Sequence, residues 1–212
     1  MAEQAGQATG PDLLAIAFAL IAERGLAGFG LMAVATRAGV TPVEVYRELP
    51  GRRALLGALT RRVDEAMLAI DQMELVGLPP RDRVFELIMR RLDALTPFRD
   101  GLERLEQDLR REPLLGLLHG CRVDRSLRWL QDVAGLPSTG LRARARRGLI
   151  GAVYVRTLGV WLGDDTTELA RTMAELDKGL RRIEALAGLS EGRSAARLDP
   201  DPGPAGMSGA AT

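Results

Sequence analysis

The hydrophobic positions of this 212-residue chain recur with the period of an α-helix along most of its length. In the first such stretch, Leu13, Ala17, Leu20 and Ile21 are spaced three and four residues apart. Glycine and proline divide the pattern into about nine segments. No run alternates between polar and apolar with β-branched enrichment, as a strand would. The pattern predicts an all-α fold with helices at about 11–24, 31–38, 42–49, 52–70, 81–96, 99–111, 113–134, 140–163 and 166–188.

The two ends of the chain lack this helical pattern. Residues 1–10 are small and polar, and residues 190–212 are mostly Gly, Pro, Ala, Ser and Asp. Such segments cannot bury enough apolar surface to offset the entropy lost on ordering. We therefore predict that residues 1–10 and 190–212 are disordered. Within the helical part, the strongest break is Leu78-Pro79-Pro80.

The second and third predicted helices have the spacing of a helix-turn-helix. Gly39 stands at the tight turn between them, and Val34 can pack against Val45 across that turn. Thr41 is expected to cap the third helix, with Glu44 three residues further on to complete a capping box. With the first helix, these elements predict a three-helix scaffold of the kind that presents its third helix to DNA.

Residues 14–56 resemble the N-terminal domain of the TetR family of bacterial regulators. The resemblance implies a helix-turn-helix DNA-binding domain at residues 11–57 and a helical ligand-binding and dimerisation domain at residues 58–189. It also implies operator DNA and a small apolar ligand as partners, and a homodimer formed through the last two helices. The matching residues are Ala17, Leu20, Ala22-Glu23-Arg24-Gly25, Leu31, Val34-Ala35, Ala38-Gly39-Val40-Thr41, Tyr46-Arg47, Pro50 and Ala54-Leu55-Leu56.

The same resemblance assigns the DNA-phosphate contacts. In the family, the cap hydroxyl, the Tyr with its neighbour, and the basic residue that opens the fourth helix hold DNA phosphates. By resemblance these roles fall on Thr41, Tyr46, Arg47 and Arg52, and Arg53 can join them. A capped helix N-terminus, a phenol and guanidinium groups all have the chemistry of phosphate ligands.

Two carboxylates in the third helix depart from the family pattern. Glu44 and Glu48 are four residues apart and share one helix face, where they would lie near DNA phosphates. We expect them to pair locally, Glu44 with Arg47 and Glu48 with Arg52. Residues 11–62 contain four acids and seven arginines, so the local charge of +3 is modest for a DNA-binding domain.

A second resemblance, in the C-terminal part, leaves an alternative function open. Val153–Arg156, Val160–Thr166 and Leu169–Leu180 are similar to the last helices of the lipid-binding accessory proteins of ubiquinone biosynthesis, which share the TetR fold. This resemblance implies a lipid-binding accessory factor that has lost operator binding. The acids of the third helix are compatible with that loss.

A ligand pocket is expected among the apolar residues of the C-terminal helices. Leu118, Trp129, Tyr154 and Trp161 are the candidate lining residues, although the same side chains could instead form the core and the dimer interface. Small residues in the eighth helix would permit close approach of a second copy: Gly148, Gly151, Ala152 and Gly159. Arg142, Arg144, Arg146 and Arg147 could meet anionic lipid head groups or an acidic partner, or form a solvated face.

The remaining composition excludes several other classes of protein. Cys121 is the only cysteine and His119 the only histidine, too few for a Cys/His metal site. Motifs for nucleotide binding and hydrolysis are absent, so we predict no enzyme, no metal and no cofactor. The first residues do not resemble a secretory signal, and no stretch is long and apolar enough for a transmembrane segment. We therefore expect a cytoplasmic protein with a net charge of +1.

Overall fold

The computed structural model describes residues 10–187. The predicted disordered segments, except for Gly10, lie outside the described residues. Residues 10–187 contain helices and no strand, as the periodicity predicts. The nine predicted helices are α1 Leu13–Arg24, α2 Leu31–Ala38, α3 Pro42–Glu48, α4 Arg52–Leu68, α6 Pro80–Leu95, α7 Arg99–Leu109, α8 Pro113–Val133, α9 Leu141–Leu162 and α10 Ala170–Ala187.

Three short elements were not predicted. They are the 3-10 turns η1 Leu26–Gly28 and η2 Thr96–Phe98 and the single-turn helix α5 Gln72–Leu75. Each is too short to show a helical period in the sequence. In α5 the signal is a local one, because the Asp71 side chain accepts a hydrogen bond from the backbone N–H of Met73 at 2.9 Å.

The predicted start of the last helix at residue 166 is wrong, because α10 begins at Ala170. The reason is the buried carboxylate of Asp164. One of its oxygens accepts from the hydroxyl of Thr166 at 2.6 Å, and the other accepts from the hydroxyl of Thr172 at 2.7 Å. These bonds, led by the one from Thr166, hold the pKa of the Asp164 carboxyl far below its usual range. Residues 164–169 accordingly lie outside any helix.

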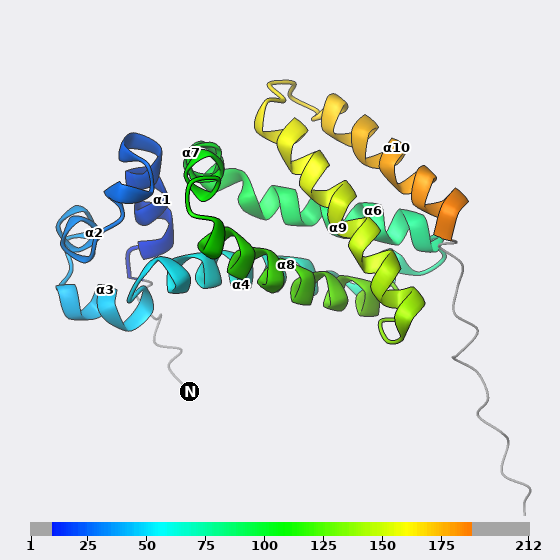
Figure 1. Cartoon of the computed structure of the whole chain (residues 1–212), viewed down its shortest axis with the longest axis horizontal. Helices are drawn as coiled ribbons and strands as arrows, with labels where there is room; N and C mark the ends of the chain where they lie inside the picture. The colour runs from blue at the N-terminus through cyan, green and yellow to red at the C-terminus, as the bar shows by residue number, and fades with distance from the viewer. Residues whose placement is uncertain (1–9, 188–212) are drawn as a thin grey trace, which may run out of the picture.

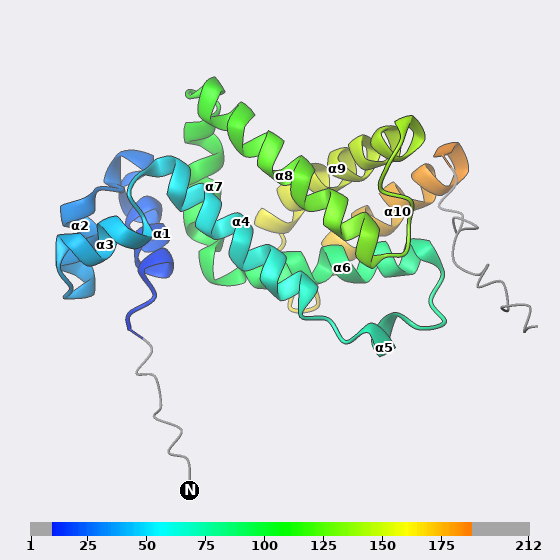
Figure 2. The same cartoon turned by 90° about the horizontal axis from the view of Figure 1, so that it is seen from below.

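The three N-terminal helices form a small bundle at one end of the molecule (Figure 1). Helix α4 leaves this bundle and runs into a larger group formed by α6 to α10 (Figures 1 and 2). In that group α9 packs along α10, and α4 packs against α6 and α8. The predicted domain boundary at residues 57 and 58 therefore falls inside one continuous helix, α4.

The small bundle also contacts the larger group directly, because α1 packs against α7. Gly101 of α7 lies so close to α1 that a Cβ atom there would come within 2.5 Å of the Phe18 carbonyl oxygen. Phe18 packs edge-on against Phe98, with ring centroids 5.2 Å apart. The Asp108 carboxylate accepts a hydrogen bond from the Leu26 N–H at 2.6 Å. A movement of α7 therefore has a direct route to the N-terminal bundle.

No helix within residues 10–187 combines the length and the apolar character needed to cross a lipid bilayer.

Candidate DNA-binding face and ligand cavity

Helix α3 has one side buried in the small bundle and the opposite side open. Val45 of α3 and Leu49, the residue after it, are buried on this side. Gly39, with φ of 68°, makes the left-handed turn that sets α3 against α2. The open side carries Val43, which is 57% exposed, and Tyr46, which is 62% exposed. This side is the one that a helix-turn-helix would present to a groove.

The N-terminus of α3 has the predicted capping box. The Thr41 hydroxyl accepts from the Glu44 N–H, and the Glu44 carboxylate accepts from both the N–H and the hydroxyl of Thr41, each at 2.7 Å. These bonds, that from the hydroxyl first, lower the pKa of Glu44. The expected close ion pair between Glu44 and Arg47 does not form, because the carboxylate turns back to the cap, and Arg47 adds only a smaller charge effect that also lowers the Glu44 pKa. In the free protein, Glu44 occupies the place where a phosphate would meet Thr41.

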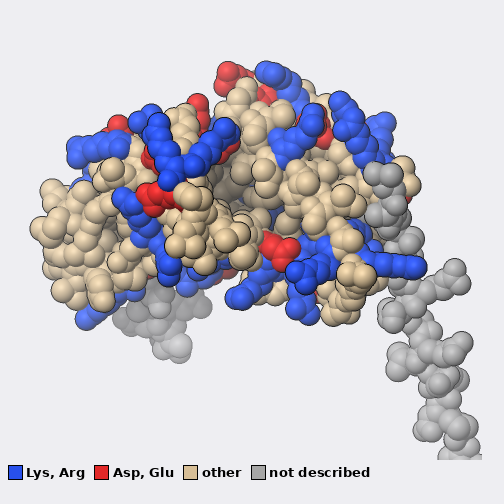
Figure 3. Space-filling view, viewed as in Figure 1, with Lys and Arg blue, Asp and Glu red and all other residues tan. Residues whose placement is uncertain are grey.

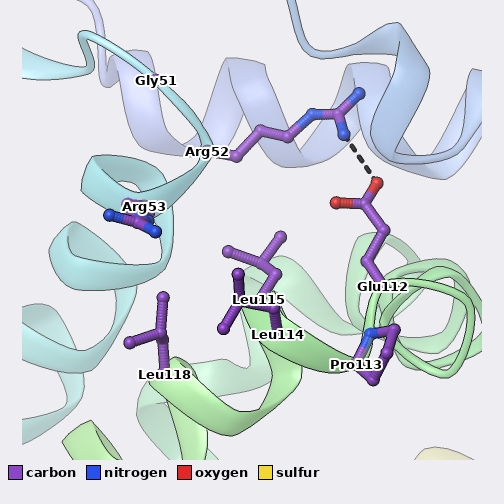
Figure 4. Close-up of a pocket in the computed structure, with 8 residues that line it drawn as sticks. All are labelled: Gly51, Arg52, Arg53, Glu112, Pro113, Leu114, Leu115 and Leu118. Atoms are coloured by element: carbon purple, nitrogen blue, oxygen red, sulfur yellow. Dashed lines mark hydrogen bonds and ion pairs between the residues drawn. The ribbon is translucent and has the colours of Figure 1, made fainter.

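Arg52, at the start of α4, does not pair with Glu48 as expected. Its Nη1 lies 2.6 Å from the Glu112 Oε1, in an ion pair between the first residue of α4 and the residue before α8. Figure 4 shows Glu112 reaching across to the guanidinium, with Leu115 of α8 nearby. The two side chains border a groove of about 630 Å³. A phosphate contact by Arg52 therefore requires this ion pair to open.

Three of the five predicted phosphate ligands have side chains that make no hydrogen bond or ion pair with the described residues. They are Tyr46, Arg47 and Arg53, and all three are exposed. Thr41 and Arg52 have the intramolecular partners just described. The structure thus places all five on α3, its cap and the first turn of α4.

Two acids of the small bundle are already neutralised. Asp12 pairs with Arg62 at 3.0 Å, and Glu23 pairs with Arg37 at 2.8 Å. The Arg37 hydrogen bond is the leading cause of the lowered Glu23 pKa. With Glu44 engaged by its helix cap, Glu48 is the one acid of residues 11–62 without such a partner in the described structure. Each of these ion pairs also uses an arginine, so the net charge of residues 11–62 stays at +3, and the outward side of α3 carries Glu44 and Glu48 beside Arg47.

A cavity of about 360 Å³ lies in the larger helical group. Residues from α4, α6, α7, α8 and α9 line it, and most of the lining is aliphatic or glycine. Helix α4 contributes Leu59, Thr60 and Val63, so the helix that carries Arg52 at its start also forms one wall of the cavity. This volume lies at the low end of the range of about 300–1,000 Å³ for small-molecule sites.

A buried polar cluster adjoins this cavity. Arg91 of α6 is 1% exposed and points Nη1 at the Asp64 carboxylate of α4 and at the Ser126 hydroxyl of α8, both at 2.7 Å. Ser126 donates a second bond to Asp64. The Arg91 guanidinium lies 5.2 Å from the ring centroid of Tyr154 of α9. Four helices therefore meet at one charge-compensated cluster.

The comparisons with known proteins agree with this geometry. Residues 13–59 match the family model described as "Bacterial regulatory proteins, tetR family". The helix-turn-helix domain is that of the TetR family. No curated protein sequence matches the chain significantly.

Solved structures show that the TetR fold extends over the whole described chain. A TetR transcriptional regulator from Nitrosomonas europaea superposes with a TM-score of 0.68 at 22% identity, covering 82% of this chain and 97% of its own. One from Rhodococcus sp. RHA1 has a TM-score of 0.57 at 21% identity, covering 84% and 95%. A putative TetR-family regulator from Mesorhizobium loti has a TM-score of 0.55 at 16% identity, covering 82% and 93%.

The structure does not bring the four predicted pocket residues of this TetR fold together. Tyr154 is 5% exposed and lines the cavity. Trp161 is in the core, under the Arg99 guanidinium at 5.2 Å from its ring centroid. Trp129 is 43% exposed, and Leu118 lies in the groove beside Arg52. Aromatic and aliphatic character predicted burial, but residue type alone could not separate cavity, core and surface.

Several polar residues of the cavity lining, among them Arg91 and His119, were not predicted from the sequence. Arg91 lies on the apolar stripe of α6, three and four residues from Ile88 and Leu87. An arginine at a core position of an amphipathic helix was a signal for a buried partner. His119 lines the cavity, and burial lowers its pKa, with a smaller effect from Arg122. Nothing in the sequence around His119 indicates a cavity.

An outward-facing row of small residues runs along α9. Ala145, Gly148, Ala152, Val155 and Gly159 are all exposed and recur every three or four residues. A Cβ atom at Gly148 or Gly159 would meet nothing within 4 Å. A glycine inside a helix costs about 1 kcal/mol relative to alanine, and packing within the chain gives no reason for these two.

Basic side chains gather elsewhere, where α8 ends and α9 begins. Figure 3 shows Lys and Arg over this end, at the lower right of the view. Arg125, Arg128, Arg142 and Arg144 are exposed there, whereas Arg146 is buried and donates to the Pro137 carbonyl oxygen. Arg147 pairs with Asp124 at 2.9 Å. The predicted cluster of four arginines is therefore divided between an exposed pair and two engaged residues.

Proposed function

We propose that this protein is a TetR-type transcriptional regulator that binds operator DNA as a homodimer and is controlled by a small, mainly apolar ligand. The observation that carries the proposal is the open side of α3 in a TetR-family domain, where Tyr46 and Arg47 are exposed and make no hydrogen bond or ion pair with the described residues. We propose residues 11–57 as the DNA-binding part and residues 58–189 as the ligand-binding and dimerisation part. No catalytic role is proposed.

On DNA, Tyr46, Arg47 and Arg53 would contact phosphates without prior rearrangement. Arg52 would exchange Glu112 for a phosphate, and Thr41 would exchange the Glu44 carboxylate for one. Such contacts set the register of α3 in the major groove, and they make the affinity dependent on salt.

The homodimer would form through α9 and α10. The exposed row of small residues on α9 supports this, because glycines without an internal packing role allow a second helix to approach closely. Paired subunits would place two α3 helices on one face of the DNA, about one helical turn apart.

The ligand would act through α8 as well as α4. Gly116 and His119 of α8 line the cavity, and Glu112, one turn earlier, holds Arg52. Arg122 of the same helix donates to the Arg53 carbonyl oxygen at 3.2 Å. A ligand that shifts α8 would therefore move the start of α4, which gives the coupling between two sites that regulation requires.

The test is the binding of fluorescently labelled DNA from upstream of the gene, measured by anisotropy across a salt series. Arg47→Ala should weaken binding and reduce the slope of log affinity against log salt by about 1, since one phosphate contact is lost. Arg110→Ala serves as the matched control, because Arg110 is an exposed arginine just after α7 that is paired with Glu106 outside the DNA face. Equal slopes for both variants would refute the assignment of the face.

The alternative, a lipid-binding accessory factor without operator binding, drew support from the two acids of α3. Engagement of Glu44 in the helix cap weakens that support. Mass spectrometry of the natively purified protein separates the two functions. A co-purified isoprenoid lipid together with no preference for upstream DNA would favour the accessory factor.

A further inference from the structure

The charges of the cavity lining are already compensated within the chain. Arg91 is paired with Asp64, and Arg147 is paired with Asp124. His119 is the remaining basic group of the lining, and its burial favours the neutral imidazole. An ionised ligand would lose its hydration here and find no unpaired counter-charge, which is strongly unfavourable.

The cavity nevertheless offers hydrogen bonds to a neutral group. Tyr154 is buried against the cavity, and its hydroxyl has no hydrogen-bond partner in the described structure. The Thr60 hydroxyl donates to the Leu56 carbonyl oxygen at 2.8 Å, which leaves its own oxygen able to accept. Most of the remaining lining is aliphatic or glycine. A ligand that suits this surface is apolar over most of its length and carries one hydroxyl or carbonyl group.

A glycine of α8 marks where such a ligand can pass. Gly120 lines the cavity and is exposed, and a Cβ atom there would meet nothing within 4 Å. A larger side chain at this position would narrow the gap between α8 and α9. The opening is therefore kept wide by the absence of a side chain, at a cost to helix stability.

We propose that the cavity binds an uncharged, mainly apolar molecule with one hydrogen-bonding group, which enters between α8 and α9 past Gly120 and is held by the Tyr154 hydroxyl. This inference rests on the ligand-binding part of the proposed function. It names the chemical class of the ligand and the residues that admit and hold it.

The test compares four probes of similar shape by isothermal titration calorimetry at pH 7.5: 1-naphthol, naphthalene, 1-naphthoate and 1-naphthylmethylammonium. We expect 1-naphthol to bind at least about tenfold tighter than either ion. Tyr154→Phe should weaken the binding of 1-naphthol about three- to tenfold, because one hydrogen bond to a neutral group is lost. The affinity for naphthalene should be unchanged.

The route is tested by Gly120→Leu, which places a side chain in the opening and should abolish binding of 1-naphthol. Cys121→Leu is the matched control, because Cys121 is the exposed neighbour on the same helix and does not line the cavity. Thermal unfolding of both variants confirms that each is folded. Equal 1-naphthol binding by Gly120→Leu and the wild type would overturn the proposed route.

Failure of the ligand class and failure of the proposed function give different results. If 1-naphthoate bound more tightly than 1-naphthol, the proposal of an uncharged ligand would be overturned, but regulation by a ligand would still stand. Binding of upstream DNA without binding of any probe would show that the cavity is a closed packing void. An unchanged affinity of Tyr154→Phe for 1-naphthol would overturn the role of the hydroxyl.

Discussion

The ion pair between Arg52 and Glu112 should weaken DNA binding, so that Glu112→Gln raises the affinity for operator DNA. Each side chain of the pair is 41% exposed, and their closest atoms are 2.6 Å apart. Pairs of this exposure contribute about 0.2–1 kcal/mol. Arg52 must leave Glu112 to hold a phosphate, so the free energy of the ion pair opposes DNA binding. Without the carboxylate charge this opposing contribution is absent, and DNA binding becomes more favourable by the same amount. The expected gain is about 1.4- to 5-fold in affinity.

The assay is anisotropy of labelled upstream DNA at a fixed salt concentration, with a control for net charge. Glu106→Gln removes one negative charge from an exposed ion pair on α7 and should change the affinity less. In an Arg52→Ala background, Glu112→Gln should lose its effect, since the two residues act as a pair. An equal gain for Glu112→Gln and Glu106→Gln, or a gain that persists in Arg52→Ala, would refute the exchange of Glu112 for a phosphate.

Three further predictions concern the cavity and the dimer. Asp64→Asn leaves the Arg91 cation buried without its counter-charge, and chemical denaturation should show a loss of about 3–5 kcal/mol in the free energy of unfolding. The lowered pKa of His119 means that the unfolded chain binds its proton more readily, so stability should fall as pH drops below about 6.5. Thermal unfolding should show that the His119→Gln variant loses less stability than the wild type when the pH is lowered from 7.5 to 5.5. Equal losses of stability would contradict the burial of a neutral imidazole. Ala152→Arg places a charge in the exposed row of α9 and should give a monomer by light scattering, whereas an unchanged dimer would exclude this face.

Much of the fold was predictable because its signals are local. Proline and glycine mark the helix ends, and the Thr41–Glu44 capping box is visible from residue spacing alone. The start of α10 was missed because the Asp164 side chain bonds Thr166 and Thr172, two and eight residues further along the chain, and helical periodicity does not report such bonds. A helix boundary set by a buried side chain leaves no periodic trace in the sequence.

The site was predictable in its residue types and less so in its partners. The resemblance placed Tyr46, Arg47 and Arg53 on one face, and the structure has them exposed there. It could not show that Arg52 meets Glu112, because those two residues are sixty positions apart in the chain. The cavity was harder still, since burial of an aromatic residue depends on which helix packs over it.

The central claim, sequence-specific DNA binding through α3, is tested most directly by one competition measurement. The wild-type protein is titrated with its own upstream DNA and with a random duplex of equal length, at the same salt concentration. The account predicts at least about a thousandfold preference for the upstream DNA. It also predicts that Tyr46→Phe combined with Arg47→Ala weakens both complexes, because these residues hold phosphates. Equal affinity of the wild type for the two duplexes would contradict the assignment of this protein as a regulator of its own upstream DNA.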